Sequence, residues 1–465
     1  MDSRTCFKSL TILSFAAAAF LLAGCSSLTN SATNIVSSAG TGSAFVVGTD
    51  APMASVVSFT AQVESIDAID ASGNSVSLIS GTPTVDFARF NGLQTLLDMN
   101  DVPAGTYDSV SITLGTATIG YLNTGSGAPT IASETATLTS STTKITLASP
   151  LVVVKAGTPV GLRVDFDLRK SILVDGTGQI TGQVTPTFDV SAVGTGDPGG
   201  YIDTMEAAVV SVNASGQSFV VQGPHGEQFT ISVNGQTEWD NNESLSALTT
   251  SSIVEVSGTL DKADQTLDAD EVAILSQNGF YAAGQVTYVH PASGAATSFD
   301  LYVRGLLPTT TGLTLGQIAQ VDLSGSEKFF IYQMHNPLTQ FLFNSSTLLA
   351  GQRVAVGGPA SGAASASAVT VNRVVLRNWG FNGTPVSGST SSSAGTFQMQ
   401  IGGFAGLLVP QTVTVYTTTK TEYRNGLSGL SGVSGTPNIR VVGLLLKDPT
   451  SGNTILIAHY VDELN

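Results

Sequence analysis

Two aspartates, Asp165 and Asp167, are the residues of this sequence whose spacing most resembles a chemical site. They lie in the segment RVDFDLR, residues 163–169. On a β-strand, side chains two positions apart face the same way and lie about 7 Å apart. That separation suits the carboxylate pair of a glycoside hydrolase or a share of a calcium site. The apolar residues that alternate with the charged ones also fit a half-buried strand whose outer face forms its own ion pairs.

Two further acidic clusters could contact a ligand. The segment EWDNNE, residues 238–243, places Trp239 among carboxylates, a combination found on some sugar-binding surfaces. Asp268 and Asp270 lie close to Asp261, Asp264 and Glu271, and such hard oxygen ligands could gather calcium. Neither cluster matches a calcium-binding loop motif, so solvated, solubilising faces are the alternative interpretation of both.

The composition excludes several classes of protein. The 465 residues include 34 acidic and 18 basic side chains, a net charge of −16 that disfavours nucleic acid as a partner. The four histidines are isolated in the sequence, without the spacing of a zinc site. Two cysteines can form at most one disulfide, which is too few for a disulfide-stabilised fold of this length. We therefore expect no metal, no cofactor and no catalytic residue.

The N-terminus has the pattern of a secretory signal. Arg4 and Lys8 precede an apolar stretch that is too short to span a bilayer comfortably, and it ends in LLAGC at Cys25. This ending resembles the lipobox of bacterial lipoproteins. The resemblance implies a signal peptide over residues 1–24, a diacylglycerol anchor on Cys25, and an outer-membrane location because Ser26 follows the cysteine. Residues 25–43 are rich in Ser, Thr and Gly and are expected to form a flexible tether.

Residues 44–192 show the short β-branched runs and turn signals of an all-β domain. An exception is the segment 87–97, where the spacing of Phe90, Leu93 and Leu96 predicts a short helix. The motifs TDAP at 49–52, VDF at 85–87, VPAGTY at 102–107 and VDFD at 164–167 resemble the bacterial lipoprotein domain-of-unknown-function family 4382. The Pro-x-Gly-x-Tyr turn is similar to that of transthyretin-type and immunoglobulin-like domains. The resemblance implies an extracytoplasmic β-sandwich without a known activity.

A Gly- and Pro-rich linker at 194–200 precedes three copies of a second unit, over residues 201–276, 279–378 and 379–465. Each copy has an upstream strand centred on a phenylalanine, followed by a Val-rich strand that ends in glycine. We expect a small β-barrel or sandwich of five or six strands in each, with the glycine at a bulge. The first copy resembles a second uncharacterised family, numbered 5666, through Thr237-Glu238-Trp239 and VEVSGTL at 254–260. The other two copies are expected to lack a clear Thr-x-aromatic motif.

The sequence therefore predicts an all-β, multi-domain envelope lipoprotein that is anchored to the membrane through Cys25 and is not an enzyme. Binding or scaffolding is its expected function, with a glycan, the cell wall or an envelope protein as the partner. Several weak modules on one chain would reinforce one another through their effective concentration. The alternative function is a glycan hydrolase that uses a carboxylate pair.

Overall fold

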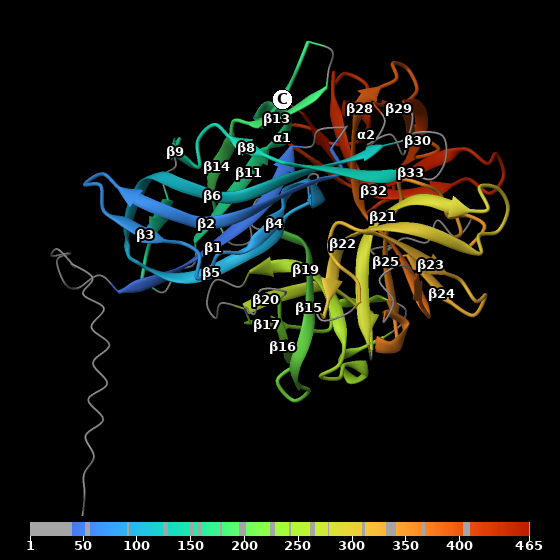
Figure 1. The fold of residues 1–465 in the computed structure, drawn as a ribbon, viewed down its shortest axis with the longest axis horizontal. Coiled ribbons are helices and arrows are strands. Elements are labelled where there is room, and N and C mark those ends of the chain that lie inside the picture. The colour runs from blue at the N-terminus through green and yellow to red at the C-terminus, as the bar shows by residue number, and fades with distance from the viewer. Residues whose placement is uncertain are drawn as a thin grey trace, which may run out of the picture. The chain divides into compact units, whose positions relative to one another are not determined.

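The computed structural model describes residues 40–51, 56–90, 93–123, 129–148, 152–156, 160–176, 179–194, 201–223, 228–240, 243–260, 266–277, 279–308, 312–331, 341–363, 368–402 and 410–464. Of the residues that the structure describes, 62% lie in strands and 5% in helices, which confirms the predicted all-β class. Residues 39–465 form one compact unit (Figure 1). In the part of the chain that is described, no helix has both the length and the apolar character of a membrane span.

The N-terminal domain is the predicted β-sandwich, drawn in blue to green in Figure 1. Its strands are β1 (Thr41–Ala51), β2 (Ser58–Asp70), β3 (Ser75–Ser77), β4 (Thr84–Asp86), β5 (Thr95–Pro103), β6 (Gly105–Asn123), β7 (Thr130–Thr135), β8 (Thr137–Leu138), β9 (Thr142–Thr146), β10 (Val152–Val154), β11 (Val160–Asp167), β12 (Ile172–Val174), β13 (Ile180–Val184) and β14 (Phe188–Val193). One sheet has the order β14-β11-β1-β5, and the other has the order β10-β6-β2-β3, with β4, β7 and β9 added beside it. Strands β12, β13 and β8 form a small third sheet.

Alternating residues of the two main sheets form the sandwich core. Phe166 lies at its centre, with its ring 5.0 Å from each of the rings of Phe59 and Phe87. The Tyr107 hydroxyl donates a hydrogen bond of 2.8 Å to the Pro103 carbonyl, which ties the Pro-x-Gly-x-Tyr turn together. The same device, a tyrosine bonded to backbone a few residues upstream, closes a corner in immunoglobulin-like sandwiches.

Two local predictions in this domain were wrong. The helix expected over 87–97 is a single 3-10 turn, η1 (Phe87–Arg89), and Leu96 lies in β5 because that segment pairs with β1. The strand expected to continue to residue 169 ends at Asp167, and a one-turn helix follows, α1 (Leu168–Ser171). It starts there because the Asp167 side chain accepts a hydrogen bond from the Lys170 backbone N–H as an N-cap.

The first barrel is closed by five strands. Its elements are β15 (Tyr201–Asn213), β16 (Ser218–Gln222), β17 (Gln228–Ser232), β18 (Glu238–Trp239), η4 (Leu245–Ala247), β19 (Ile253–Leu260) and β20 (Thr266–Ser276). They have the order β17-β16-β15-β19-β20-β18, and a parallel pairing of β17 with β20 closes the ring. Strand β18 adds to the far end of β20.

The second and third copies repeat this topology. The second contains β21 (Phe280–His290), β22 (Ser298–Leu307), β23 (Ile318–Asp322), β24 (Lys328–Ile331), β25 (Arg353–Gly358), η5 (Ala360–Ala363), β26 (Ala368–Thr370) and β27 (Arg373–Arg377). The third contains β28 (Trp379–Pro385), β29 (Thr396–Ile401), β30 (Gln411–Tyr416), β31 (Glu422–Arg424), α2 (Leu430–Val433), β32 (Ile439–Lys447) and β33 (Thr454–Glu463). In the second copy β26 and β27 share the place of β20, since β26 pairs with β23 and β27 pairs with β25.

The Val-rich run of residues in each barrel ends in a glycine at the same position, where the strand passes close to the last strand of the barrel. A Cβ on Gly258, Gly358 or Gly443 would lie 2.1, 2.7 or 2.0 Å from a carbonyl oxygen of the last strand. In the first and third barrels the pairing register shifts next to this glycine, as a bulge requires. Only a residue without a side chain fits at this crossing.

The third barrel retains the Thr-x-aromatic motif that the sequence comparison assigned only to the first. Thr237 donates a hydrogen bond of 2.8 Å to the Ala269 carbonyl, and Thr421 donates one of 2.8 Å to the Ala458 carbonyl. The expectation that this copy lacks a clear motif was therefore wrong. Thr421-Glu422-Tyr423 is the counterpart of Thr237-Glu238-Trp239, with tyrosine in the aromatic position.

The domains share apolar contacts. Phe45 and Val47 of β1 pack with the core of the first barrel, while Val46 faces the sandwich core. A second contact joins the outer faces of the first two barrels through Leu275 and Tyr281. The expected array of modules is thus a set of domains that are packed against one another.

Candidate functional site

Asp165 and Asp167 have separate environments. Asp165 lies directly opposite Asp189 on β14, and burial raises its pKa, opposed by Arg440 of the third barrel. Asp167 caps α1, and its carboxylate lies 2.7 Å from the Lys170 ammonium group. Asp167 therefore has a structural role that the alternating pattern did not indicate. A ligand for either residue stays a prediction.

The acidic segment around Trp239 contributes ion pairs between domains. Glu238 lies 2.7 Å from the Lys420 ammonium group of the third barrel, and Glu243 lies 3.1 Å from the Arg373 guanidinium of the second. The Trp239 ring is half-buried against the core of its own barrel. The carboxylates of this segment therefore link the first barrel to the second and third barrels.

Of the remaining residues that were predicted to contact a ligand or to carry the anchor, the structure describes Asp268 and Asp270. Asp268 is half-buried and Asp270 is exposed on β20. Asp261, Asp264, Cys25, the signal segment 1–24 and most of the tether lie outside the described residues. Across the described ranges there is no group of three or more His, Cys, Asp or Glu side chains that could hold a metal.

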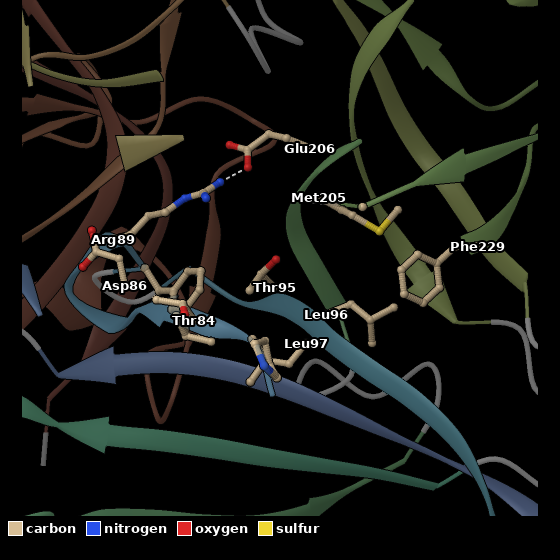
Figure 2. Close-up of a pocket in the computed structure, with 13 residues that line it drawn as sticks. Thr84, Asp86, Arg89, Thr95, Leu96, Leu97, Met205, Glu206 and Phe229 are labelled. Carbon is tan, nitrogen blue, oxygen red and sulfur yellow. Dashed lines mark ion pairs between the residues drawn. The ribbon is translucent and has the colours of Figure 1, made fainter. Parts of the chain in front are cut away.

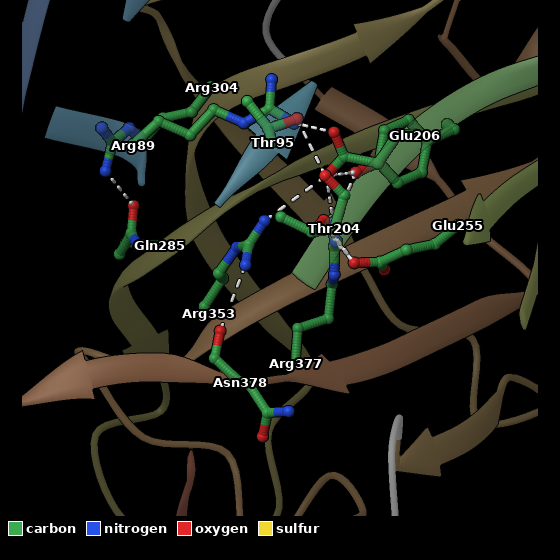
Figure 3. A network of polar contacts seen from close by, with 11 residues as sticks. Arg89, Thr95, Thr204, Glu206, Glu255, Gln285, Arg304, Arg353, Arg377 and Asn378 are labelled. Carbon is green, nitrogen blue, oxygen red and sulfur yellow. Dashed lines mark hydrogen bonds and ion pairs between the residues drawn. The ribbon is translucent and has the colours of Figure 1, made fainter. Parts of the chain in front are cut away.

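A buried polar network, which we call the arginine hub, lies where the domains meet (Figure 3). Its centre is Arg377 of β27, whose Nη1 donates a hydrogen bond of 2.6 Å to Glu206 of β15. The Arg377 Nη2 pairs with Glu255 of β19 and donates a bond of 2.9 Å to the Thr204 hydroxyl. Tyr281 of β21 donates a bond of 2.9 Å to Glu206. One guanidinium of the second barrel thus bridges two carboxylates of the first.

Three more arginines complete the hub. Arg89 of η1 forms an ion pair with the second oxygen of Glu206, so the sandwich is tied to the first barrel. Arg353 of β25 lies 3.4 Å from Glu206. Arg304 of β22 donates a bond of 2.8 Å to Asp86 of the sandwich. Four of the ten arginines of the chain therefore converge on one place.

The third barrel reaches the hub through Trp379 at the start of β28. Its indole ring lies 5.5 Å from the Arg304 guanidinium carbon and 5.8 Å from that of Arg353. Such a contact with the face of an indole ring stabilises a guanidinium, by about 2 kcal/mol or more where water is excluded. Trp379 is 1% exposed, so water is excluded here. All four domains contribute side chains to the hub.

Burial sets the electrostatics of the hub. Desolvation lowers the pKa values of Arg89 and Arg353, and it raises the pKa of the Tyr281 hydroxyl. Removal of charges from water is costly unless each finds a partner of opposite charge. The opposite charges of the hub are therefore buried together, which favours one fixed arrangement of the domains.

No local motif indicates the hub, because its residues are spread from position 86 to position 379. Comparisons with known proteins match two of the domains. Residues 41–181 match the model of a domain of unknown function, DUF4382, and residues 206–273 match that of another, DUF5666. The sandwich is a DUF4382 domain and the first barrel a DUF5666 domain. A search among curated proteins found no match.

A cavity of about 80 Å³ lies between the DUF4382 and DUF5666 domains, beside the hub (Figure 2). Arg89 and Glu206 form its polar wall, and Leu96, Met205 and Phe229 form its apolar wall. The cavity has room for a few water molecules. It is too small for a ligand of drug size, which needs several hundred Å³.

A larger cleft of about 410 Å³ lies between the DUF5666 barrel and the second barrel. Gln222, Thr250 and Ser251 line one side, and Leu307 and Pro308 line the other. Hydroxyl and amide groups beside an apolar wall are typical of sites for a sugar or a short peptide. Among the described cavities, this cleft has the best size for a ligand.

A second polar contact joins the DUF4382 domain to the DUF5666 barrel, close to charged groups of the third barrel. The Gln94 backbone N–H donates a bond of 2.7 Å to Asp203 at the start of the DUF5666 barrel. Burial raises the pKa of Asp203 to about 7, opposed by Arg424 and increased by Asp462 of the third barrel. Arg424 in turn lies 3.8 Å from the centre of the Tyr460 ring. Asp203 is thus a group that titrates near neutral pH inside a domain junction.

Proposed function

We propose that this protein is a lipid-anchored lipoprotein of a bacterial cell envelope and acts as a non-catalytic scaffold. The arginine hub supports the proposal, because it joins side chains of four domains in one buried network. A buried network of this kind favours one geometry, since loss of a carboxylate leaves several buried guanidinium groups without a partner of opposite charge. A scaffold needs such a fixed arrangement, whereas a tether of independent modules does not.

The anchor rests on Cys25 and the LLAGC segment that ends there. Two or more acyl chains are needed for stable attachment, since a single chain binds membranes only marginally. The expected result is incorporation of labelled palmitate into the protein and accumulation of an unprocessed precursor under globomycin. The variant Cys25→Ala should lose the label, and Cys6→Ala should keep it. Labelling that is unchanged in Cys25→Ala would exclude the anchor.

The cleft between the first two barrels is the proposed position of the partner, a glycan, the cell wall or an envelope protein. Its hydroxyl-bearing wall includes the exposed Ser251. We expect Ser251→Trp to fill the cleft and abolish binding in a glycan array and in pull-down from envelope extract. The control, Ser246→Trp, changes an exposed serine outside the cleft and should keep binding. Equal binding by both variants would move the site elsewhere.

The scaffold proposal also has a direct catalytic test. The purified protein is incubated with envelope polysaccharides, and released sugars are measured. We expect no release above background. Release that disappears in Asp165→Asn or Asp167→Asn, with the fold intact by circular dichroism, would replace the scaffold with a glycan hydrolase.

A further inference from the structure

A very small cavity lies inside the arginine hub. Its volume is about 10 Å³, and its lining includes Arg89, Arg304, Arg353, Gln285 and Trp379. A space of this size holds one particle as large as a water molecule. Three guanidinium groups therefore surround a single small site.

The charges of the hub do not balance. Its four arginines, Arg89, Arg304, Arg353 and Arg377, face three carboxylates, those of Asp86, Glu206 and Glu255. The side chains of Arg353 and Arg377 are 4% and 0% exposed, so water cannot screen the surplus. Buried charge that is not neutralised costs several kcal/mol. The hub therefore holds one positive charge in excess of its carboxylates.

Arg304, one of the arginines that line the cavity, carries a buried hydrogen-bond donor. Its side chain is 3% exposed, its Nε donates to Asp86, and its Nη1 donates a bond of 3.1 Å to Gln285. Its Nη2 is buried and has no hydrogen-bond partner among the described residues. Buried N–H groups are almost always satisfied by protein, water or a ligand. Arg304 also lines the cavity, so an acceptor there would complete its bonds.

We propose that this cavity binds one monovalent inorganic anion of halide size, which is chloride under physiological conditions. The ion would accept hydrogen bonds from the guanidinium groups and bring the formal charge of the hub to zero. An anion close to Arg353 and Arg89 would also oppose the lowering of their pKa values that burial causes. Sulfate, phosphate and carboxylates are too large for a site of this volume.

The first test measures thermal unfolding of the purified protein in sodium chloride and in sodium gluconate at equal ionic strength. A ligand that binds only the folded state raises Tm with its concentration, following the logarithm of one plus the ratio of concentration to Kd. We expect a chloride-dependent rise of several degrees that bromide reproduces and gluconate does not. Identical Tm values in the two salts would overturn the proposal.

The variant Arg304→Gln removes the charge and the unsatisfied donor and should lose the difference between chloride and gluconate. The control Lys420→Gln breaks an exposed ion pair between barrels and should keep it. A chloride response that survives in Arg304→Gln would place the anion elsewhere and overturn this assignment.

The second test does not depend on a variant that folds. Crystals of the unaltered protein grown in sodium bromide are measured at the bromine absorption edge. We expect an anomalous peak among Arg89, Arg304 and Arg353. Density for water without a bromide peak would overturn the proposal. Neither outcome bears on the scaffold proposal, which binding assays decide separately.

Discussion

The first and second barrels have the same strand order, yet their charges are opposite. Residues 201–276 contain twelve acidic side chains and one basic one, whereas residues 280–378 contain three acidic and five basic ones. Gly258 and Gly358 face equivalent carbonyl groups of the last strand in the two barrels. The two barrels therefore share their strand order but differ in net charge. The acidic excess of the first is opposite in sign to the basic excess of the second.

The difference is sharpest at one cross-strand pair on the outer face. In the first barrel Glu206 lies directly opposite Glu255, and in the second Ala283 lies opposite Ala355. The register aligns both pairs with Asn382 and Arg440 of the third barrel. Two like charges directly opposite one another destabilise a sheet. The arginines that the neighbouring domains supply therefore stabilise this pair of the first barrel.

The outward-facing strand positions of each barrel determine its interfaces with the other domains, whereas the inward-facing positions form its core. The inward neighbours Val254, Val354 and Ile439 are all fully buried apolar residues, as a barrel core demands. The outward positions change from one copy to the next, because each faces a different domain. Repeats with a shared core can thus assemble in one defined order.

The largest effect is expected from removal of the bridge between the two barrels. Arg377→Ala leaves Glu206 and Glu255 opposite one another in a buried place. Breakage of a buried ion pair costs about 3–5 kcal/mol, so the free energy of unfolding in urea should fall by that amount. The double variant Arg377→Ala, Glu255→Gln should recover part of the loss. A loss below 1 kcal/mol would show that the opposite charges do not join the barrels.

A somewhat smaller effect is expected from Asp203, which belongs to the acidic excess of the first barrel. Its folded pKa of about 7 exceeds the unfolded value of 3.8, so the folded state binds the proton more tightly. Stability should therefore fall as the pH rises from about 4 to about 7 and stay lower above that range. Asp203→Asn should flatten this profile and stabilise the protein at pH 8 by about 2–4 kcal/mol. Parallel profiles for the two proteins, measured by urea unfolding, would contradict the assignment.

The shared frame is tested by alanine at the bulge glycines. Gly258→Ala and Gly443→Ala each place a Cβ about 2 Å from a carbonyl oxygen of the last strand. We expect each to lower the free energy of unfolding by about 1–3 kcal/mol, since the strands must separate to admit the methyl group. Gly105→Ala, where the nearest atom is 3.7 Å away, is the matched control and should have little effect. A large difference between the first two variants would mean that the copies do not share this crossing.

The smallest effect is expected from the exposed ion pair between the first and third barrels. Lys420 and Glu238 are about half exposed, with side-chain exposures of 49% and 47%. Pairs of this kind contribute about 0–1 kcal/mol, so Lys420→Ala should shift the urea midpoint only slightly and less in high salt. A loss as large as that of Arg377→Ala would remove the distinction between buried and exposed pairs.

The sequence was sufficient for the fold class and for the repeat. Alternating apolar residues predicted strands, and the strand expected around a phenylalanine in each copy is present, at Phe219, Phe299 and Phe397. The helix over 87–97 was mispredicted because tertiary pairing of Leu96 with β1 overrode a helical spacing. The end of β11 was mispredicted because an aspartate cap competes with strand continuation.

The hub could not be predicted from local motifs, since its residues come from distant segments that only the packed domains bring together. Glu206 and Glu255 look like ordinary polar positions on exposed strand faces. One signal was present in the sequence, namely the charge of each repeat copy counted separately. Twelve acids in one copy next to a copy with a basic excess predict an interface, although not its geometry.

The central claim, that the domains form one interlocked unit, is tested most directly by differential scanning calorimetry of the purified protein. We predict a single cooperative transition in which the calorimetric and van't Hoff enthalpies agree, because the barrels and the sandwich share buried charges and apolar contacts. Separate transitions for individual domains, unchanged by Arg377→Ala, would contradict the account.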